Sequence, residues 1–557
     1  MAEEKNYIDI PKEMFEFTQK DEKITDKKFD TKPIGYFKDA MIRFSKNKGS
    51  VVSFIIIGII ILYAIFIPML VPANKATTMD TYYAKAAPRI SWVKNATDNR
   101  VLNGGSSEEY NVNKVIYEYA IGVAAESKDG NIVKMSDSYK SEYQPVNYTN
   151  GSYKVKQGRN TTTYYKLNVD NYLEVGFVYL SVEQSEYQNL LKWQEETGKQ
   201  LVYPLIDESS PYYCGNLDRS NSANYWYKAS SDKLLTAATP ITVGGYEITK
   251  QDINENGILC PVSTNGNDIE FLQFSDKLVL EDNYLRDGSG NLVYSLATGG
   301  GDASTHQLKV RVLYYNYYQY KNGFLPDYFF GTDSQGYDLA YRMATGLRLS
   351  LLLAVVVSLI NFVIGALYGA VEGYYGGAID LTMERVSDIL AGIPFVVVSS
   401  LFQMHLAAKV GPIPSLIFAF IITGCIGTAA SVRAQFYRFK NQEYVMAART
   451  LGARDRRIIW KHIFPNTLGT LVTSSVLVIP SVIFSESMLS YLGIVNLGGS
   501  DTTSLGTLLS EASGIWTQFP HLMIFPATVI SLLMICFNLF GNGLRDAFNP
   551  QLRGTEE

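Results

Sequence analysis

The chain has 557 residues, of which 47% are hydrophobic and 18% charged, and its formal net charge is -5 at pH 7. This length allows about four domains. A negative charge without a long basic stripe excludes nucleic acid as an expected partner. Four cysteines are too few for a disulfide scaffold, and with four histidines a catalytic metal cluster is not expected.

The N-terminal region predicts a cytoplasmic tail and then a membrane span. Residues 1–48 begin polar and lysine-rich, and residues 33–48 alternate aromatic with charged side chains, which favours an amphipathic elbow on the inner membrane surface. Residues 49–72 carry no charge and suffice to cross a bilayer, which takes about 20 apolar residues. A signal peptide would have a shorter apolar core. Basic residues before the span place the N-terminus inside: Lys38, Arg43, Lys46 and Lys48.

Residues 73–328 contain no run that could span a membrane. Short segments rich in β-branched residues and tyrosine, such as 172–182 and 308–318, alternate with turn signals and predict a mixed, mainly β domain. Because one span precedes it, this domain is expected outside the cell membrane. There Cys214 and Cys260 either form a disulfide or remain free thiols, since the sequence gives no distance between them.

The segment Asp252–Gly257 begins like an EF-type calcium loop, with side-chain oxygens at positions 1, 3 and 5 and glycine at position 6. Position 12 of such a loop would be Ser263, whereas the loop normally requires a bidentate Glu there. An ordinary Asn/Gly turn is the preferred interpretation, and no metal site is assigned.

Five further runs without charged residues are each longer than the ~18 residues that mark a candidate membrane-spanning helix. They are residues 349–371, 389–408, 410–432, 463–485 and 522–544. With the first span they make six, and both termini fall inside. Residues 433–463 then form a cytoplasmic loop whose many basic side chains satisfy the positive-inside rule.

Within that region, residues 443–466 (EYVMAARTLGARDRRIIWKHIFPN) combine several local signals. Tyr444–Leu451 consists of good helix formers. Gly452 follows where a helix would end in a left-handed residue. A basic cluster comes next, and Pro465 is expected to break the helical register where the next span begins.

This order of a short helix with paired alanines, a glycine, an Ile-Ile pair and a proline resembles the EAA loop of ABC importer permeases. In that family the loop helix docks in a cleft on an ATPase subunit and transmits its motion. The resemblance implies an ATPase-coupling role for Tyr444, Ala447, Ala448, Leu451, Gly452, Arg454 and Pro465. An ordinary basic loop that follows the positive-inside bias is the alternative.

Other motifs resemble the dipeptide/oligopeptide branch of these permeases, and specifically the C-type subunit of the permease pair. They are FGTDSQGYD (330–338), GLRLSL (346–351), GYYGG (373–377), ESMLSYLG (486–493) and NLFGNGLRD (538–546), together with Asp380, Arg385, Asp388 and Pro394. The resemblance covers residues 36–74 and 329–553, and the large insert between them departs from the usual short version.

The resemblance implies an α-helical polytopic membrane protein with six transmembrane helices, the type I importer fold, and an extracytoplasmic domain inserted between helices 1 and 2. The permease core is expected over 329–557. The implied partners are a second homologous permease, two ATPase subunits, an extracellular substrate-binding lipoprotein and peptides, in a bacterial cell membrane. No GxxxxGK[ST] loop occurs in this chain, so ATP and Mg²⁺ are expected on the ATPase subunits, with no catalytic residue or cofactor here.

A stripe of glycines at four-residue spacing, Gly365, Gly369, Gly373 and Gly377, would let helices approach closely in lipid. It is equally consistent with packing inside the subunit and with pairing of two permeases.

Polar groups inside spans are costly and must face protein or water. The candidates for a translocation path are Asn361, Gln403, Glu486 and Asn538, with His405 nearby. Glu486 could line the path and engage a peptide amine, or be hydrogen-bonded between subunits in a structural role. Two rival functions are the same machinery with another cargo, such as nickel chelates or antimicrobial peptides, and a membrane-anchored receptor with an external sensing domain.

Overall fold

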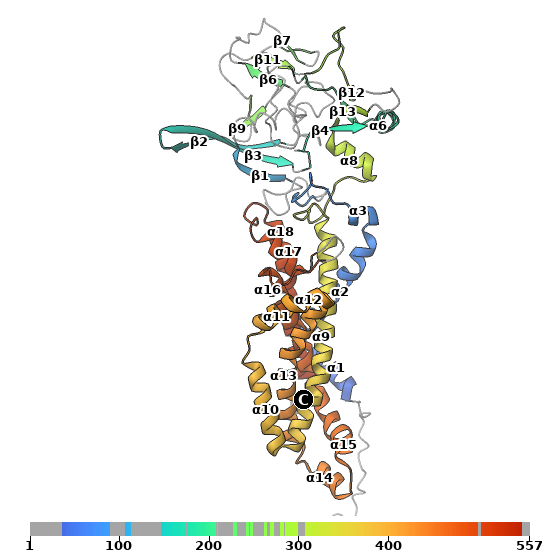
Figure 1. The fold of residues 1–557 in the computed structure, drawn as a ribbon, viewed down its shortest axis with the longest axis vertical. Coiled ribbons are helices and arrows are strands. Elements are labelled where there is room, and N and C mark those ends of the chain that lie inside the picture. The colour runs from blue at the N-terminus through green and yellow to red at the C-terminus, as the bar shows by residue number, and fades with distance from the viewer. Residues whose placement is uncertain are drawn as a thin grey trace, which may run out of the picture.

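The computed structural model describes residues 36–89, 106–112, 146–170, 172–173, 175–207, 209, 227–230, 241–243, 246–248, 261–264, 268–271, 279–282, 284–298, 307–498 and 503–548. The molecule is elongated, with a bundle of long helices at one end and the strands at the other (Figure 1). The cysteines Cys214 and Cys260 and the segment Asp252–Gly257 lie outside the described residues, so the disulfide and calcium-loop predictions stay predictions.

Within the described residues, five helices are long and apolar enough to cross a membrane. They are α2 (Lys48–Leu70), α9 (Leu339–Tyr375), α13 (Pro412–Phe439), the continuous stretch Asp455–Tyr491, and α18 (His521–Phe548). The shorter helices of the bundle are α1 (Tyr36–Lys46), α12 (Ala407–Val410), α14 (Glu443–Thr450) and α17 (Leu505–Ala512).

The span expected over 389–408 is not one straight helix. The chain instead forms α10 (Gly377–Ala391) and α11 (Phe395–His405), which are bent by 76° at the break between them. Pro394 causes the break because its ring disfavours helical geometry at the preceding residue and it has no N–H to donate. With this bent pair counted as one span, the described residues contain the six spans that the sequence predicts.

Pro465 also acts differently from the expectation. The helix does not end there but runs from α15 (Asp455–Arg457) through a π-helical segment, η4 (Ile458–Ile463), into α16 (Phe464–Tyr491). Pro465 lies in the first turn of α16, where a missing N–H is tolerated. The wider turn just before the proline lets the helix continue without a conventional break.

The bundle is held together most tightly between α9 and α13. A methyl group on Gly369 would lie 2.2 Å from the carbonyl oxygen of Ala429, and on Gly365 it would lie 2.6 Å from Thr428. A methyl group on Gly373 would likewise lie 2.7 Å from the Cβ atom of Phe436. These glycines therefore serve packing inside the subunit, whereas Gly377 lies past the end of α9 and is not part of the stripe.

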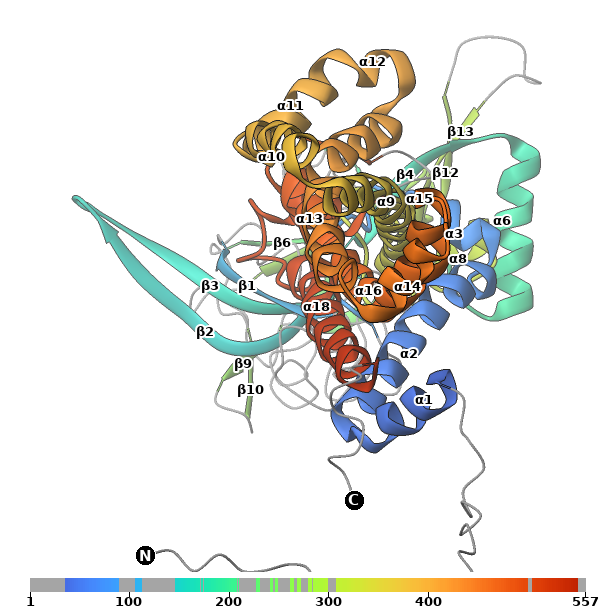
Figure 2. The ribbon, with the colours of Figure 1, turned by 90° about the horizontal axis from the view of Figure 1, so that it is seen from below.

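A continuous apolar core joins α2, α9, α16 and α18 and includes the fully buried side chains Leu347, Val357, Ile483 and Leu533. The first helix, α1, packs separately on the end of α18, where Ala40 and Phe44 contact Ala547. In the view from below, α10, α11 and α12 lie on one side of the bundle, and α1 and α2 on another (Figure 2).

The segment between α2 and α9 contains the described strands. They are β1 (Ser106–Val112), β2 (Val146–Gln157), β3 (Asn160–Asp170), β4 (Phe177–Val182), β5 (Val202–Tyr203), β6 (Tyr227–Ser230), β7 (Ile241–Val243), β8 (Tyr246–Ile248), β9 (Pro261–Thr264), β10 (Asp268–Phe271), β11 (Val279–Asp282), β12 (Ser295–Thr298) and β13 (Gln307–Leu313). Its helices are α3 (Ala73–Thr77), α6 (Gln184–Thr197) and α8 (Tyr314–Asn322). Strand β13 is central, since β12, β4 and β5 all pair with it in antiparallel register.

The tyrosine run expected to continue a strand through 318 instead turns into helix α8 after Leu313. Helical spacing buries Tyr314 and Tyr318 against Tyr83, with ring centroids 5.5 and 5.2 Å from that ring. The hydroxyls of Tyr318 and Tyr328 are 2.6 Å apart, and Tyr314 donates to Asp80 at 2.6 Å. Burial raises the pKa of these phenols, so they stay neutral and form a hydrogen-bonded aromatic core.

The chain passes between the helix bundle and the strands twice, and the two connecting segments are hydrogen-bonded to each other. The backbone N–H of Lys85 donates to the carbonyl of Asp333 at 2.8 Å, and that of Thr332 to Ala86 at 3.0 Å. Gly331 has a φ of +79°, and a Cβ there would lie 2.3 Å from the Ala86 carbonyl oxygen. The buried carboxylate of Asp333 accepts from Arg342 of α9 at 3.1 Å, which ties this junction to the bundle.

The glycine packing can be tested by adding one methyl group. We expect Gly369→Ala to destabilise the subunit by about 1–3 kcal/mol, because the methyl has no room against Ala429. Gly427→Ala is the matched control, because Gly427 lies on α13 with open space around it, and alanine gains up to about 1 kcal/mol of helix propensity. Thermal unfolding of both variants in detergent measures the difference, and equal melting temperatures would contradict tight α9–α13 packing.

Candidate functional site

Helix α14 (Glu443–Thr450) lies at the end of the bundle away from the strands (Figure 1). Glu443 occupies its first turn, where a negative charge complements the helix dipole. Val445 is fully buried, whereas Tyr444 and Met446 are 40% and 53% exposed. The helix therefore holds to the protein by one face and presents the rest outward.

The turn after α14 presents an apolar side chain to solvent. Leu451 is 89% exposed, the largest exposure among the described large apolar residues. Gly452 has a φ of +80° and donates its N–H to the Arg449 carbonyl at 2.9 Å, and Ala453 donates to Ala448 at 3.1 Å. The left-handed glycine closes the helix in this way, as the sequence predicted.

A small apolar core supports α14 from behind. Val445 packs with Ile458, Ile459 and Ile463 of the following helix and with Phe436 of α13. This core fixes α14 to α13 and η4.

Polar contacts reinforce the same attachment. The hydroxyl of Tyr374, at the end of α9, donates to Asp455 at 2.6 Å, and Arg449 of α14 lies over the Tyr374 ring at 5.9 Å. Asn466 donates to the hydroxyl of Tyr444 at 3.2 Å. Helix α14 is thus connected to α9 and α16 as well.

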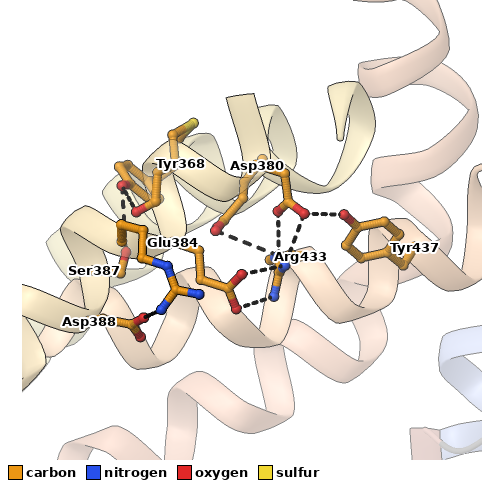
Figure 3. A network of polar contacts seen from close by, with 10 residues as sticks. Tyr368, Asp380, Glu384, Ser387, Asp388, Arg433 and Tyr437 are labelled. Atoms are coloured by element: carbon orange, nitrogen blue, oxygen red, sulfur yellow. Dashed lines mark hydrogen bonds and ion pairs between the residues drawn. The ribbon is translucent and has the colours of Figure 1, made fainter. Parts of the chain in front are cut away.

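Close to this attachment, Arg433 of α13 forms an ion-pair network with α10 (Figure 3). Its guanidinium donates twice to Asp380, at 2.6 and 3.0 Å, and twice to Glu384, at 3.0 and 3.1 Å. Glu372 of α9 lies 3.6 Å from the Nε atom, and Tyr437 also donates to Asp380. One planar cation therefore joins carboxylates from two other helices, a task that suits the fork geometry of arginine.

Comparison with known proteins identifies the family. The profile described as binding-protein-dependent transport system inner membrane component matches residues 363–554, and that of the N-terminal TM domain of oligopeptide transport permease C matches residues 35–88. The dipeptide transport system permease protein DppC of Bacillus subtilis is 41% identical over 233 residues, which is 41% of this chain and 70% of that protein. This chain belongs to the family of binding-protein-dependent transport permeases.

Two further relatives agree with this assignment. The oligopeptide transport system permease protein OppC of Bacillus subtilis is 40% identical over 228 residues, covering 41% of this chain and 73% of that protein. OppC of Escherichia coli is 39% identical over the same length, with the same coverage. The family is a membrane transport component and not an enzyme. The two family profiles together leave residues 89–362 unmatched.

The coupling residues predicted for the permease fall on one continuous stretch of α14 and the helix after it. Ala447 is exposed and Ala448 half-buried, so the alanine pair straddles the edge of the attached face. Arg454 is exposed, and so is Pro465, which lies further along, in the first turn of α16. The structure thus places a row of exposed apolar side chains, Tyr444, Ala447 and Leu451, at the end of the bundle.

The residues predicted for a translocation path have separate hydrogen-bond partners. Asn361 is buried and donates to the Phe420 carbonyl at 3.4 Å. Gln403 donates to the Pro412 carbonyl and Asn538 to the Met534 carbonyl, at 2.9 and 2.8 Å. Asn538 and His405 are exposed. Asn361 therefore braces α9 against α13, whereas Gln403 and Asn538 lie at or near the surface.

Glu486 is fully buried and surrounded by hydroxyl groups. Ser350 of α9 and Ser490 of α16 donate to its two carboxyl oxygens at 2.9 and 3.0 Å, and Ser487 lies 3.5 Å away. Ser504, the N-cap of α17, contributes a further hydrogen bond. Glu486 therefore joins α9, α16 and α17 inside this subunit, and both hydrogen bonding between subunits and contact with a peptide amine stay predictions.

Sequence reasoning missed the Arg433 network, because Arg433 was assigned to a loop. The structure places Arg433 and Arg438 on the last turns of α13 and Lys440 at its cap. One signal was present: Asp380 and Glu384 are four residues apart and so share a helix face, where a single cation can meet both.

The Arg433 network predicts a large effect from one substitution. We expect Arg433→Gln to destabilise the α10–α13 contact by about 1–3 kcal/mol, because it leaves three carboxylates without their cation in a partly buried site. Arg433→Lys should recover little, since an ammonium cannot bind two carboxylates in a bidentate manner. Thermal unfolding and ATPase activity of the assembled transporter measure the effect.

Arg385→Gln provides the matched control, because Arg385 pairs with Asp388 on the same helix, α10, but both side chains are more than half exposed. Exposed pairs are worth under about 1 kcal/mol. If both arginine variants behaved alike, the network would have no special role.

Replacing Glu486 separates packing from hydrogen bonding. We expect Glu486→Gln to retain assembly, since its amide oxygen still accepts from one of the two serines, Ser350 or Ser490, and its NH2 group donates to the hydroxyl oxygen of the other. Glu486→Leu leaves these buried hydroxyls without their acceptor and should cost about 1–3 kcal/mol for each group. Thermal unfolding compares the two, and a Leu variant as stable as wild type would contradict the bridging role.

Proposed function

We propose that this permease subunit forms half of a path that carries peptides into a bacterial cell, driven by ATP hydrolysis in partner subunits. The similarity of its motifs to the dipeptide/oligopeptide branch supports peptide cargo. So do the names of its relatives, which are permeases of dipeptide and oligopeptide transport systems. A second homologous permease supplies the other half of the path.

The distribution of charge supports an orientation. Basic residues gather at the end of the bundle that carries α1 and α14: Arg43, Lys46, Lys48, Arg438, Lys440, Arg449, Arg454, Arg456, Arg457 and Lys461. Positive charge favours the cytoplasmic side. Residues 1–48 and the coupling loop 433–463 are then cytoplasmic, 49–72 is the first span, 73–328 lies outside, 329–557 is the permease core, and both termini are inside.

Helix α14 is the proposed contact with the ATPase subunit. The observation that carries this proposal is the exposed apolar Leu451 beside a rigid glycine turn, on a helix anchored by buried Val445. Tyr444 and Met446 of the same short helix are also exposed, and apolar side chains gathered on a surface mark protein interaction sites. Arg454 continues the contact surface beyond the turn, and Pro465 positions α16.

Movement of α14 would reach the path through the spans to which it is attached. ATP-driven closure of two ATPase subunits, which bind ATP and Mg²⁺, would displace α14 and with it the ends of α9, α13 and α16. The spans would then shift between outward-open and inward-open states, an equilibrium that differential binding biases.

The translocation path is proposed along the exposed side of α9 and α16. A groove of about 280 Å³ lies between them, lined by apolar side chains such as Leu359 and Val476. The hydroxyls of Ser358 and Ser475 beside it donate to backbone carbonyls, so the lining is apolar. Such a surface suits peptides with varied side chains. Gln403 and Asn538 are proposed to supply polar contacts, and Asn361 and Glu486 to hold the helices.

The strands between α2 and α9 are proposed to meet the substrate-binding lipoprotein outside the cell. Tyr317 and Tyr320 occupy the face of α8 that is not in the tyrosine core. The Tyr320 hydroxyl donates to Glu186 at 2.8 Å. Burial and, after it, this contact raise the pKa of Tyr320 to about 12, so it offers a neutral aromatic surface.

ATPase coupling is tested by a pair of leucine variants. Leu451 and Leu492 both cap a helix, are exposed, and precede a glycine with positive φ, but they lie at opposite ends of the bundle. We expect Leu451→Asp to abolish co-purification of the ATPase subunits in detergent, as Gly452→Trp should, while Leu492→Asp retains them.

If no ATPase subunits co-purify with the wild-type subunit, the coupling proposal is wrong. Cargo is tested separately by ATP-dependent uptake of labelled di- and oligopeptides into proteoliposomes that hold the assembled transporter. If the transporter contains its ATPase partners but takes up neither dipeptides nor oligopeptides, the coupling proposal stands and peptides are excluded as cargo.

A further inference from the structure

The helix after α14 carries a strongly basic cavity that shares only Arg454 with the proposed coupling contact and no residue with the ion-pair network. The cavity has a volume of about 480 Å³ and is lined by Arg454, Arg456, Arg457 and Trp460. All four side chains are exposed. Figure 1 shows α15, which bears two of these arginines, between α14 and the rest of the bundle.

The three guanidinium groups lack anionic partners in the part of the chain that the structure describes. None of them forms an ion pair with a described carboxylate. The nearest acid in sequence, Asp455, accepts a hydrogen bond from Tyr374 at 2.6 Å. Three like charges around one cavity repel one another, and an anion inside it would remove this repulsion.

The length of the helix places this cavity beside the membrane surface. The stretch Asp455–Tyr491 has 37 residues and is therefore about 55 Å long at 1.5 Å per residue. The hydrocarbon core is about 30 Å thick, so roughly eight residues project beyond it at each end if the helix is centred. Trp460, the sixth residue of the stretch, then lies in the headgroup zone, and the arginines lie just beyond it.

Trp460 fits this location. Its ring packs on Phe464, with centroids 4.9 Å apart, and the residue remains 42% exposed. Tryptophan is enriched at membrane–water interfaces because its ring is apolar and its N–H is polar. The cavity therefore has an aromatic wall on the membrane side and cationic walls on the aqueous side.

We propose that this cavity binds the phosphodiester headgroup of an anionic membrane lipid. Guanidinium groups match phosphate oxygens in bidentate geometry, and basic pockets on the cytoplasmic side of membrane proteins bind anionic headgroups. The indole of Trp460 packs against the glycerol and upper acyl chain. The bound lipid sets the height of the α15 segment, and therefore of α14, relative to the bilayer. The inference depends on the proposed orientation but not on the cargo.

The test uses the complete transporter, with its co-expressed partners, in nanodiscs of phosphatidylcholine that contain phosphatidylglycerol or lack it. Native mass spectrometry counts the phosphatidylglycerol molecules retained. We expect Arg456→Gln with Arg457→Gln to weaken retention by roughly fivefold per arginine. Lysine at both positions should preserve most of it, because an ammonium still attracts phosphate as a point charge.

Arg545→Gln is the matched control, because it removes an exposed arginine from the last turn of α18, near α1. It should retain phosphatidylglycerol as wild type does. Equal retention by the double glutamine variant and wild type would overturn the proposal. Loss of ATPase subunits from that variant with unchanged lipid retention would also overturn it, and would identify an acidic ATPase surface as the occupant. Lipid retention is measured without cargo or ATP, so its failure is distinguishable from failure of the proposed transport function.

Discussion

The close approach of α9 and α13 is the constraint on which the rest of the bundle depends. Gly365, Gly369 and Gly373 leave no room for a single methyl group between these helices. Without a hydrophobic driving force between helices in lipid, such close packing is a main source of their association. This packing fixes the axial position of α13 relative to α9. It therefore decides where the side chains on the last turns of α13 lie.

Two features of the end of the bundle that carries α14 follow from that alignment. Arg433 comes within reach of carboxylates on α9 and α10, so charge attaches α10, whose one buried residue is Asp380, to the bundle. Phe436, less than one turn further along α13, joins the small core beneath Val445. The helix that presents Leu451 thus rests on the same two spans that the glycines lock together.

The opposite end is fastened by a different kind of contact. Backbone hydrogen bonds link Lys85 to Asp333 and Thr332 to Ala86, and Gly331 and Gly336 permit this approach because both have positive φ and no Cβ. Burial raises the pKa of the Asp333 carboxyl, and the Arg342 guanidinium and backbone N–H groups oppose this rise. Among the described residues, short polar contacts therefore attach the inserted segment to α9.

The sequence by itself determined the membrane class, the positions of the apolar spans, the short helix ending at Gly452 and, through its motifs, the family. These are properties of local composition, periodicity and steric preference, which act over a few residues. It did not determine the bend at Pro394, the π-helical segment before Pro465, the helix formed by the tyrosines after Leu313, or the partners of Arg433 and Glu486. Only the tertiary structure decided those, because each depends on which helices meet, and contacts between distant residues override local propensity.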